Sequence, residues 1–281
     1  MAKLVMSAFA DEYSRDFDTQ LSMLKEQGID YLEPRFIGGT NIADFDAASA
    51  KEIKDKLDAN GIGISSIGSP LGKINLAGDM EAHMEQAKRV CETANILDSK
   101  YVRMFSFYLR EGKTGKECRN EVVDAVGRML DIADAAGVTM CHENEARIYG
   151  ESPENCLDLL EQFGGRLRCV FDMGNFVLDQ HPPYPGAYRM LKPYIEYFHI
   201  KDSMAKGAIV PPGCGEAHIE DILKAYIKTA EKDTFITLEP HLETFDGLNK
   251  LVGKEFENPY KFESKEAAFL TAIEKLRELI A

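Results

Sequence analysis

The chain has 281 residues, with 33 lysines and arginines against 47 aspartates and glutamates, so its formal net charge is −14 at neutral pH. An acidic chain without a basic cluster is unsuited to nucleic acid or to an anionic membrane surface, because both need grouped positive charge. Its apolar runs are far shorter than the roughly 18 residues that a membrane-spanning helix needs. We therefore expect neither nucleic acid nor membrane among its partners.

Six cysteines are scattered along the chain, and no two of them form a C-x-x-C motif. In a chain of this size, such spacing is typical of free thiols in a reducing compartment. We therefore predict a cytoplasmic protein.

A pattern of helix, glycine and short strand repeats along the chain. Gly28, Gly61 and Gly137 each follow a helical stretch and precede a strand-like run. Glycine just past a helix end adopts the left-handed conformation that closes the helix, and strands alternating with helices indicate parallel βαβ units. Eight candidate strands begin near Lys3, Asp30, Gly63, Tyr101, Val138, Arg168, Glu196 and Thr234. We predict an α/β fold in which residues 1–281 form a single domain, a (β/α)8 barrel.

Helical spacing of apolar residues is clearest over residues 79–97, 117–136 and 264–280. These helices cover the barrel, and their apolar residues also permit a homo-oligomer. Three long segments, 180–185, 203–218 and 241–262, follow late strands. Because loops after the strands form the active-site face of a parallel barrel, we expect these segments to border the site.

Polar residues cluster where predicted strands five to eight end. Side chains alternate along a strand, so residues two apart lie on the same face. If Cys141, Val170, Tyr197 and Thr237 point into the barrel, the residues two positions later also point inward, and these are Glu143, Asp172, His199 and Glu239. Each acidic residue alone has a simpler explanation as a helix cap or an ion-pair partner, but four polar positions at successive strand ends favour a site. Three carboxylates and one imidazole suit one divalent metal ion, with Mn²⁺ or Mg²⁺ favoured and Co²⁺ or Zn²⁺ as further candidates.

The segments His142-Glu143-Asn144, Phe171-Asp172-Met173-Gly174-Asn175, Phe198-His199-Ile200-Lys201-Asp202 and Leu238-Glu239-Pro240 resemble the sugar phosphate isomerase/epimerase family. This family belongs to the xylose-isomerase-like TIM-barrel superfamily, and the resemblance covers nearly the whole chain. It implies that Glu143, Asp172, His199 and Glu239 are the metal ligands. It also implies that Glu143 and Glu239 are the catalytic acid/base pair.

One departure leaves the substrate class open. Ketose 3-epimerases usually place a substrate-binding histidine three residues after the aspartate, where this chain has Asn175. Asn175 can still hydrogen-bond a hydroxyl, and Lys201, two residues after His199, is a second candidate for contact with substrate. Glu216 lies in Gly213-Cys214-Gly215-Glu216, which resembles the family's glycine–glutamate loop after strand seven.

Other polar residues are expected around the mouth of the barrel. Glu145 and His241 each lie two residues past a proposed ligand, and we take both as candidates for substrate binding. Glu33 and Arg35 end strand two with the same parity. We expect them to pair with each other, without a catalytic role.

The resemblance and the residues together predict a divalent-metal-dependent isomerase or epimerase acting on a ketose or keto-sugar. A cation that chelates a carbonyl and the neighbouring hydroxyl makes the intervening C–H acidic and stabilises the enediolate, while Glu143 and Glu239 move the proton. Elimination from the same enediolate would make the protein a lyase, an inosose-type dehydratase or a keto-glycoside eliminase. A non-catalytic sugar-binding barrel is the third hypothesis.

Overall fold

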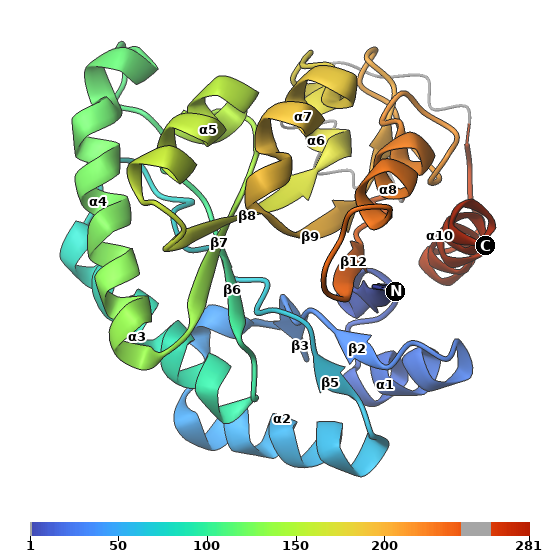
Figure 1. Cartoon of the computed structure of the whole chain (residues 1–281). Helices are drawn as coiled ribbons and strands as arrows, with labels where there is room; N and C mark the ends of the chain where they lie inside the picture. The colour runs from blue at the N-terminus through green and yellow to red at the C-terminus, as the bar shows by residue number, and fades with distance from the viewer. Residues whose placement is uncertain (1, 243–259) are drawn as a thin grey trace.

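The computed structural model describes residues 2–242 and 260–281, in which eight parallel strands form a barrel (Figure 1). The strands are β1 (Leu4–Ala8), β2 (Tyr31–Leu32), β5 (Gly63–Ile64), β6 (Tyr101–Met104), β7 (Thr139–Glu143), β8 (Leu167–Asp172), β9 (Ile195–Ile200) and β12 (Thr234–Leu238). Their order in the sheet is β5-β2-β1-β12-β9-β8-β7-β6. A parallel bridge between Ile67, just past β5, and Val102 of β6 joins the two edges. The predicted (β/α)8 barrel is thus confirmed, and each strand begins within one residue of its predicted start.

Helices cover the outside of the sheet (Figure 1). They are α1 (Phe17–Glu26), α2 (Ala47–Asn60), α3 (Met80–Ile96), α4 (Gly115–Ala136), α5 (Pro153–Gln162), α6 (Met173–Leu178), α7 (Tyr188–Leu191), α8 (Ile219–Ile227) and α10 (Lys265–Ile280). Short helical turns are η1 (Ala10–Glu12), η2 (Ile42–Asp44), η3 (Tyr149–Glu151), η4 (Pro183–Ala187) and η5 (Lys192–Tyr194). Two small antiparallel pairs lie outside the barrel sheet, β3 (Phe36–Ile37) with β4 (Thr40–Asn41) and β10 (Asp202–Ser203) with β11 (Ile209–Val210).

Side chains at the helix ends explain where the helices begin and end. Asp46 caps the start of α2 by accepting from the backbone N–H of Ser49, and Thr114 forms a capping box with Glu117 at the start of α4. At the other ends, Gly61 and Gly137 adopt the left-handed conformation, as the sequence predicts. These caps turn the chain sharply from each helix into the next strand.

Two apolar cores hold the barrel. The larger lies between the sheet and the helices, and a small second one contains Cys141, Val170 and Tyr197. Because these three residues share the inward parity on neighbouring strands, the second core fills the barrel interior below the site. The buried His83 of α3 belongs to the outer packing, where its Nε2 accepts a hydrogen bond of 2.9 Å from the Gly72 backbone N–H.

Among the described residues, no helix is both long enough and apolar enough to cross a bilayer. All six cysteines are free thiols. Of the segment 241–262, residues 243–259 lie outside the described part of the chain. The cytoplasmic location, the homo-oligomer and the assignment of residues 1–281 to one domain stay predictions.

Candidate metal centre and active site

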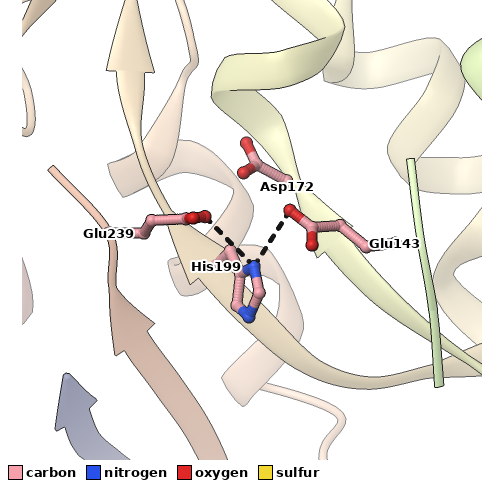
Figure 2. A group of neighbouring side chains, drawn as sticks. All are labelled: Glu143, Asp172, His199 and Glu239. Atoms are coloured by element: carbon pink, nitrogen blue, oxygen red, sulfur yellow. Dashed lines mark ion pairs between the residues drawn. The ribbon is translucent and has the colours of Figure 1, made fainter. Parts of the chain in front are cut away.

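Four side chains meet at the carboxyl ends of neighbouring strands (Figure 2). Glu143 and Asp172 are the last residues of β7 and β8, His199 lies in β9, and Glu239 directly follows β12. The strand register places His199 beside Asp172 on one side and beside Thr237 of β12 on the other. All four residues are buried, and one ligand atom of each lies within 4.8 Å of those of the others. The barrel therefore builds one compact, water-poor group from four strands.

The orientation of His199 identifies the atom that faces the carboxylates. Its Nε2 lies 3.2 Å from both carboxylate oxygens of Glu33. Its Nδ1 lies 3.1 Å from Oε1 of Glu143 and 3.3 Å from Oε2 of Glu239, as Figure 2 shows. Neither Nδ1 contact has hydrogen-bond geometry, and Nδ1 and Oε2 of Glu143 are buried without a hydrogen-bond partner.

This arrangement fits a metal ligand set. A histidine that binds a metal usually donates its other ring N–H to a carboxylate, which fixes the tautomer. Burial lowers the pKa of His199, but Glu143 and Glu33 outweigh it and raise the pKa well above its usual range, so the ring is protonated without an ion. An ion would replace the Nδ1 proton, and Nε2–H would then donate to Glu33 while the Nδ1 lone pair points between Glu143 and Glu239. Carboxylate oxygens and imidazole nitrogen are common ligands of divalent cations. The residues present thus match the predicted ion in both chemistry and orientation.

The three carboxylates differ in how well the protein stabilises their charge. Burial and the neighbouring carboxylates raise the pKa of Asp172 to about 6, against the opposing charge of Lys201. Burial also acts on Glu143, but His199 and Arg103 outweigh it and lower the pKa to about 2. Lys201 and His241 similarly outweigh burial at Glu239, whose pKa lies well below its usual range. A divalent cation would stabilise all three anions, Asp172 most of all.

Residues 21–279 match the family described as the xylose isomerase-like TIM barrel. The chain belongs to this family. Among solved structures, the probable 3-DHS dehydratase AsbF from Bacillus anthracis is 16% identical with a TM-score of 0.73, over 98% of each chain. D-psicose 3-epimerase with D-tagatose, from Clostridium cellulolyticum H10, has the same identity, coverage and TM-score. The IOLI protein with a binding zinc atom is 18% identical with a TM-score of 0.71, over 99% of this chain and 98% of that one.

The family match confirms the resemblance found in the sequence. At these identities, the likeness to individual xylose isomerase-like barrels shows the fold alone, and those structures include both an epimerase and a dehydratase. No curated protein matches the chain.

Lys201 and Asn175 directly contact the three central carboxylates. Lys201 Nζ donates to Oδ2 of Asp172 at 3.0 Å, to Oδ1 of Asn175 at 3.0 Å and to Oε2 of Glu239 at 3.3 Å. Asn175 Nδ2 donates to the Asn144 carbonyl at 2.9 Å and to Oε1 of Glu143 at 3.4 Å. Both residues thus orient the carboxylates, and their contact with substrate stays a prediction.

His241 and Glu145 lie farther toward the mouth of the barrel. His241 links Glu239 to Glu12, with Nε2 3.1 Å from Oε1 of Glu239 and Nδ1 3.0 Å from Oε1 of Glu12. Burial would lower the pKa of His241, but these two carboxylates outweigh it and raise the pKa to about 9. Glu145 instead forms an ion pair of 2.7 Å with Lys73. Their predicted roles in substrate binding are not decided by these contacts.

Glu216 lies on the glycine loop that follows β11. Its Oε1 accepts a hydrogen bond of 3.0 Å from the Ala205 backbone N–H, and Glu216 is exposed to solvent. The buried Asp202 shapes this loop, because its carboxylate accepts from the backbone N–H groups of Gly213, Gly215, Ala217 and Ser203. The hydrogen bonds of Asp202 therefore hold the backbone of this loop in place. Substrate binding by Glu216 stays a prediction.

Glu33 and Arg35 do not pair with each other, so the prediction that they would is wrong. Glu33 accepts from Tyr197 and His199 inside the barrel. Arg35 pairs with Glu239 at 3.0 Å and with Asp11 and Glu12 of η1. Both side chains are near enough to the site to meet stronger partners there, since two carboxylates of η1 approach Arg35 and an imidazole approaches Glu33.

Sequence reasoning missed Arg103 of β6 altogether. Its Nη1 lies 3.2 Å from Oε2 of Glu143 and 3.9 Å from Oε1 of Glu239. A signal was available, because Arg103 is a charged residue inside the apolar run from Tyr101 to Phe105 and has inward parity beside Cys141. A buried arginine in a strand needs a carboxylate partner, and the site supplies two.

Proposed function

We propose that this protein is a divalent-metal-dependent enzyme that isomerises or epimerises a ketose or keto-sugar. The observation that carries the proposal is the buried Nδ1 of His199, which lacks a hydrogen-bond partner and lies within 3.3 Å of carboxylate oxygens of Glu143 and Glu239. Glu143, Asp172, His199 and Glu239 would hold the ion. The oxygen-rich set favours Mn²⁺ or Mg²⁺, with Co²⁺ and Zn²⁺ as further candidates.

A bound divalent ion would polarise a substrate carbonyl and stabilise the negative charge that follows loss of the neighbouring proton. The protein must then supply groups that move this proton. Glu143 and Glu239 stand on two sides of His199 Nδ1 (Figure 2), and both are ionised at neutral pH because neighbouring cations lower their pKa values. We assign removal of the proton to one glutamate and its return to the other.

Opposite placement of the two bases favours epimerisation, because a proton removed from one face and returned to the other inverts the carbon. A single glutamate acting alone would give aldose–ketose isomerisation instead. Lys201 and Asn175 hold the carboxylates in place through direct hydrogen bonds. We further propose that Lys201, Asn175, Glu145, His241 and Glu216 contribute contacts to substrate hydroxyls.

Elimination is the second candidate function. The likeness to the probable 3-DHS dehydratase has the same TM-score, 0.73, as the likeness to D-psicose 3-epimerase. The same proton abstraction would produce a lyase if a β-oxygen left from the resulting anion. A third possibility, a sugar-binding barrel without turnover, would have no use for two ionised glutamates at one point.

Incubation of the metal-loaded protein with a panel of ketoses and keto-sugars in heavy water separates these functions. Deuterium in a recovered stereoisomer or aldose supports the proposal, whereas loss of water or of an aglycone supports the lyase. Glu143→Gln and Glu239→Gln should each abolish exchange, while Glu121→Gln, which changes an exposed glutamate paired with Arg110, should not. Sugar binding that needs no metal, with no exchange in any substrate, would overturn the enzyme assignment.

A further inference from the structure

Arg103 occupies an unusual place among the cations of the site. Lys201 and Arg35 pair with Glu239, whereas Arg103 lies within 4.0 Å of both Glu143 and Glu239. Its side chain is 6% exposed. A fully charged guanidinium at this depth is costly unless its donors and its charge are satisfied. The residues around it show how this is achieved.

The guanidinium is fixed on three sides. Its Nε donates to the Ser69 carbonyl at 3.3 Å, and its Nη2 donates to the Gly68 carbonyl at 3.1 Å. The rings of Phe9 and Phe105 have centroids 5.1 Å and 5.0 Å from the guanidinium carbon. These distances are in the range of cation–π contacts. These contacts hold the guanidinium in one position, and its Nη1 is the atom directed at the two glutamates.

This fixed cation offsets a repulsion that the proposed chemistry creates. Two carboxylates that serve one substrate from two sides must lie close together, and each then disfavours the charged form of the other. A guanidinium that faces both attracts each of them to a defined position. Lys201 bonds Asp172 and Glu239 instead, and its ammonium has no planar fork with which to face two glutamates at once.

We propose that Arg103 is a positioning residue, which holds the carboxylates of Glu143 and Glu239 in the orientation that the metal and the substrate require. This inference rests on the proposed function for its catalytic part. Its structural part concerns the metal ligands and does not depend on which sugar is bound. Misplacement of a reacting group by about 1 Å can cost about 100-fold in rate, which sets the scale of the expected effect.

The experiment compares Arg103→Lys and Arg103→Gln with the same two changes at Arg168. Arg168 is a matched control, because it also pairs with a buried glutamate, Glu196, at 3.1 Å, but lies at the start of β8, away from Asp172. Electron paramagnetic resonance of bound Mn²⁺ reports the symmetry of the ligands without any substrate. Steady-state rates with the ketose that shows exchange report catalysis.

Both Arg103 variants should change the Mn²⁺ spectrum and lower kcat about 100-fold at a KM within threefold of wild type. The Arg168 variants should leave the spectrum and kcat unchanged. If Arg103→Gln does not fold, Arg103→Lys, which keeps the charge and loses the fork, decides the question.

Two results would overturn the inference. The first is an unchanged Mn²⁺ spectrum with an unchanged kcat in both variants. The second is a raised KM with unchanged kcat and spectrum, which would make Arg103 a substrate contact. A wild-type protein that binds Mn²⁺ but exchanges no proton in any sugar would defeat the proposed function, while the spectra of the variants would still test the role of Arg103.

Discussion

Replacement of Glu33 by glutamine tests whether the ring nitrogen of His199 is set up to bind metal. Glu33 is completely buried, and both of its carboxylate oxygens lie 3.2 Å from Nε2 of His199. Glutamine keeps an acceptor of the same size but removes the negative charge that makes the imidazole a stronger ligand. Loss of such a supporting carboxylate typically weakens metal binding 10- to 100-fold, or about 1.4 to 2.7 kcal/mol.

Isothermal titration calorimetry with Mn²⁺ on chelator-treated protein measures this change directly. Tyr197→Phe is the matched control, because the Tyr197 hydroxyl also donates to Oε1 of Glu33, at 3.0 Å, and its removal leaves the carboxylate charged. We expect an affinity for Tyr197→Phe within about threefold of wild type, since a second donor is less important than the charge. A Glu33→Gln protein that folds normally and binds Mn²⁺ within twofold of wild type would refute the reasoning.

Three further outcomes are expected. Mn²⁺ at about 100 times its Kd should raise the free energy of unfolding by about 2.7 kcal/mol, and Asp172→Asn should abolish most of the resulting rise in Tm. Burial lowers the pKa of His83 below 6.5, so the folded protein binds this proton less well than the unfolded chain does, and stability should fall as the pH drops below about 6.5. His83→Gln should remove this contribution, so the fall in the free energy of unfolding between pH 7 and pH 5, measured by urea titration, should be smaller than in wild type. Asp202→Ala should lower the free energy of unfolding by about 3 kcal/mol or more in urea titrations, because four backbone N–H groups lose their acceptor. A decrease below about 1 kcal/mol would contradict the role of Asp202 in holding the loop.

Much of the fold was predictable because the signals are local. Gly61 and Gly137 close helices and are followed by strands, and this requires only the backbone freedom of glycine over a few residues. Alternation along strands likewise predicted that Glu143 and Asp172 point into the barrel, because parity is counted within one strand. The small pairs β3–β4 and β10–β11 were not predicted, since two-residue strands carry no periodic pattern.

The partners of the central residues were harder to predict because they depend on closure of the barrel. Glu33 meets His199 across 166 residues of sequence, and Arg35 meets Glu239 across 204. Parity showed that such residues face inward, but not which of several inward charges would be nearest. Glu33 and Arg35 were paired with each other because only their closeness in sequence was visible. The contacts of Arg103 with Glu143 and Glu239 needed the structure for the same reason.

Crystals grown with Mn²⁺ and measured at a wavelength where manganese scatters anomalously test the central claim most directly. We predict one anomalous peak within about 2.5 Å of Nδ1 of His199 and of a carboxylate oxygen from each of Glu143, Asp172 and Glu239. Lys201 should then have moved away from at least one of these carboxylates. A map with no peak among the four side chains, or with the peak bound elsewhere, would contradict the account.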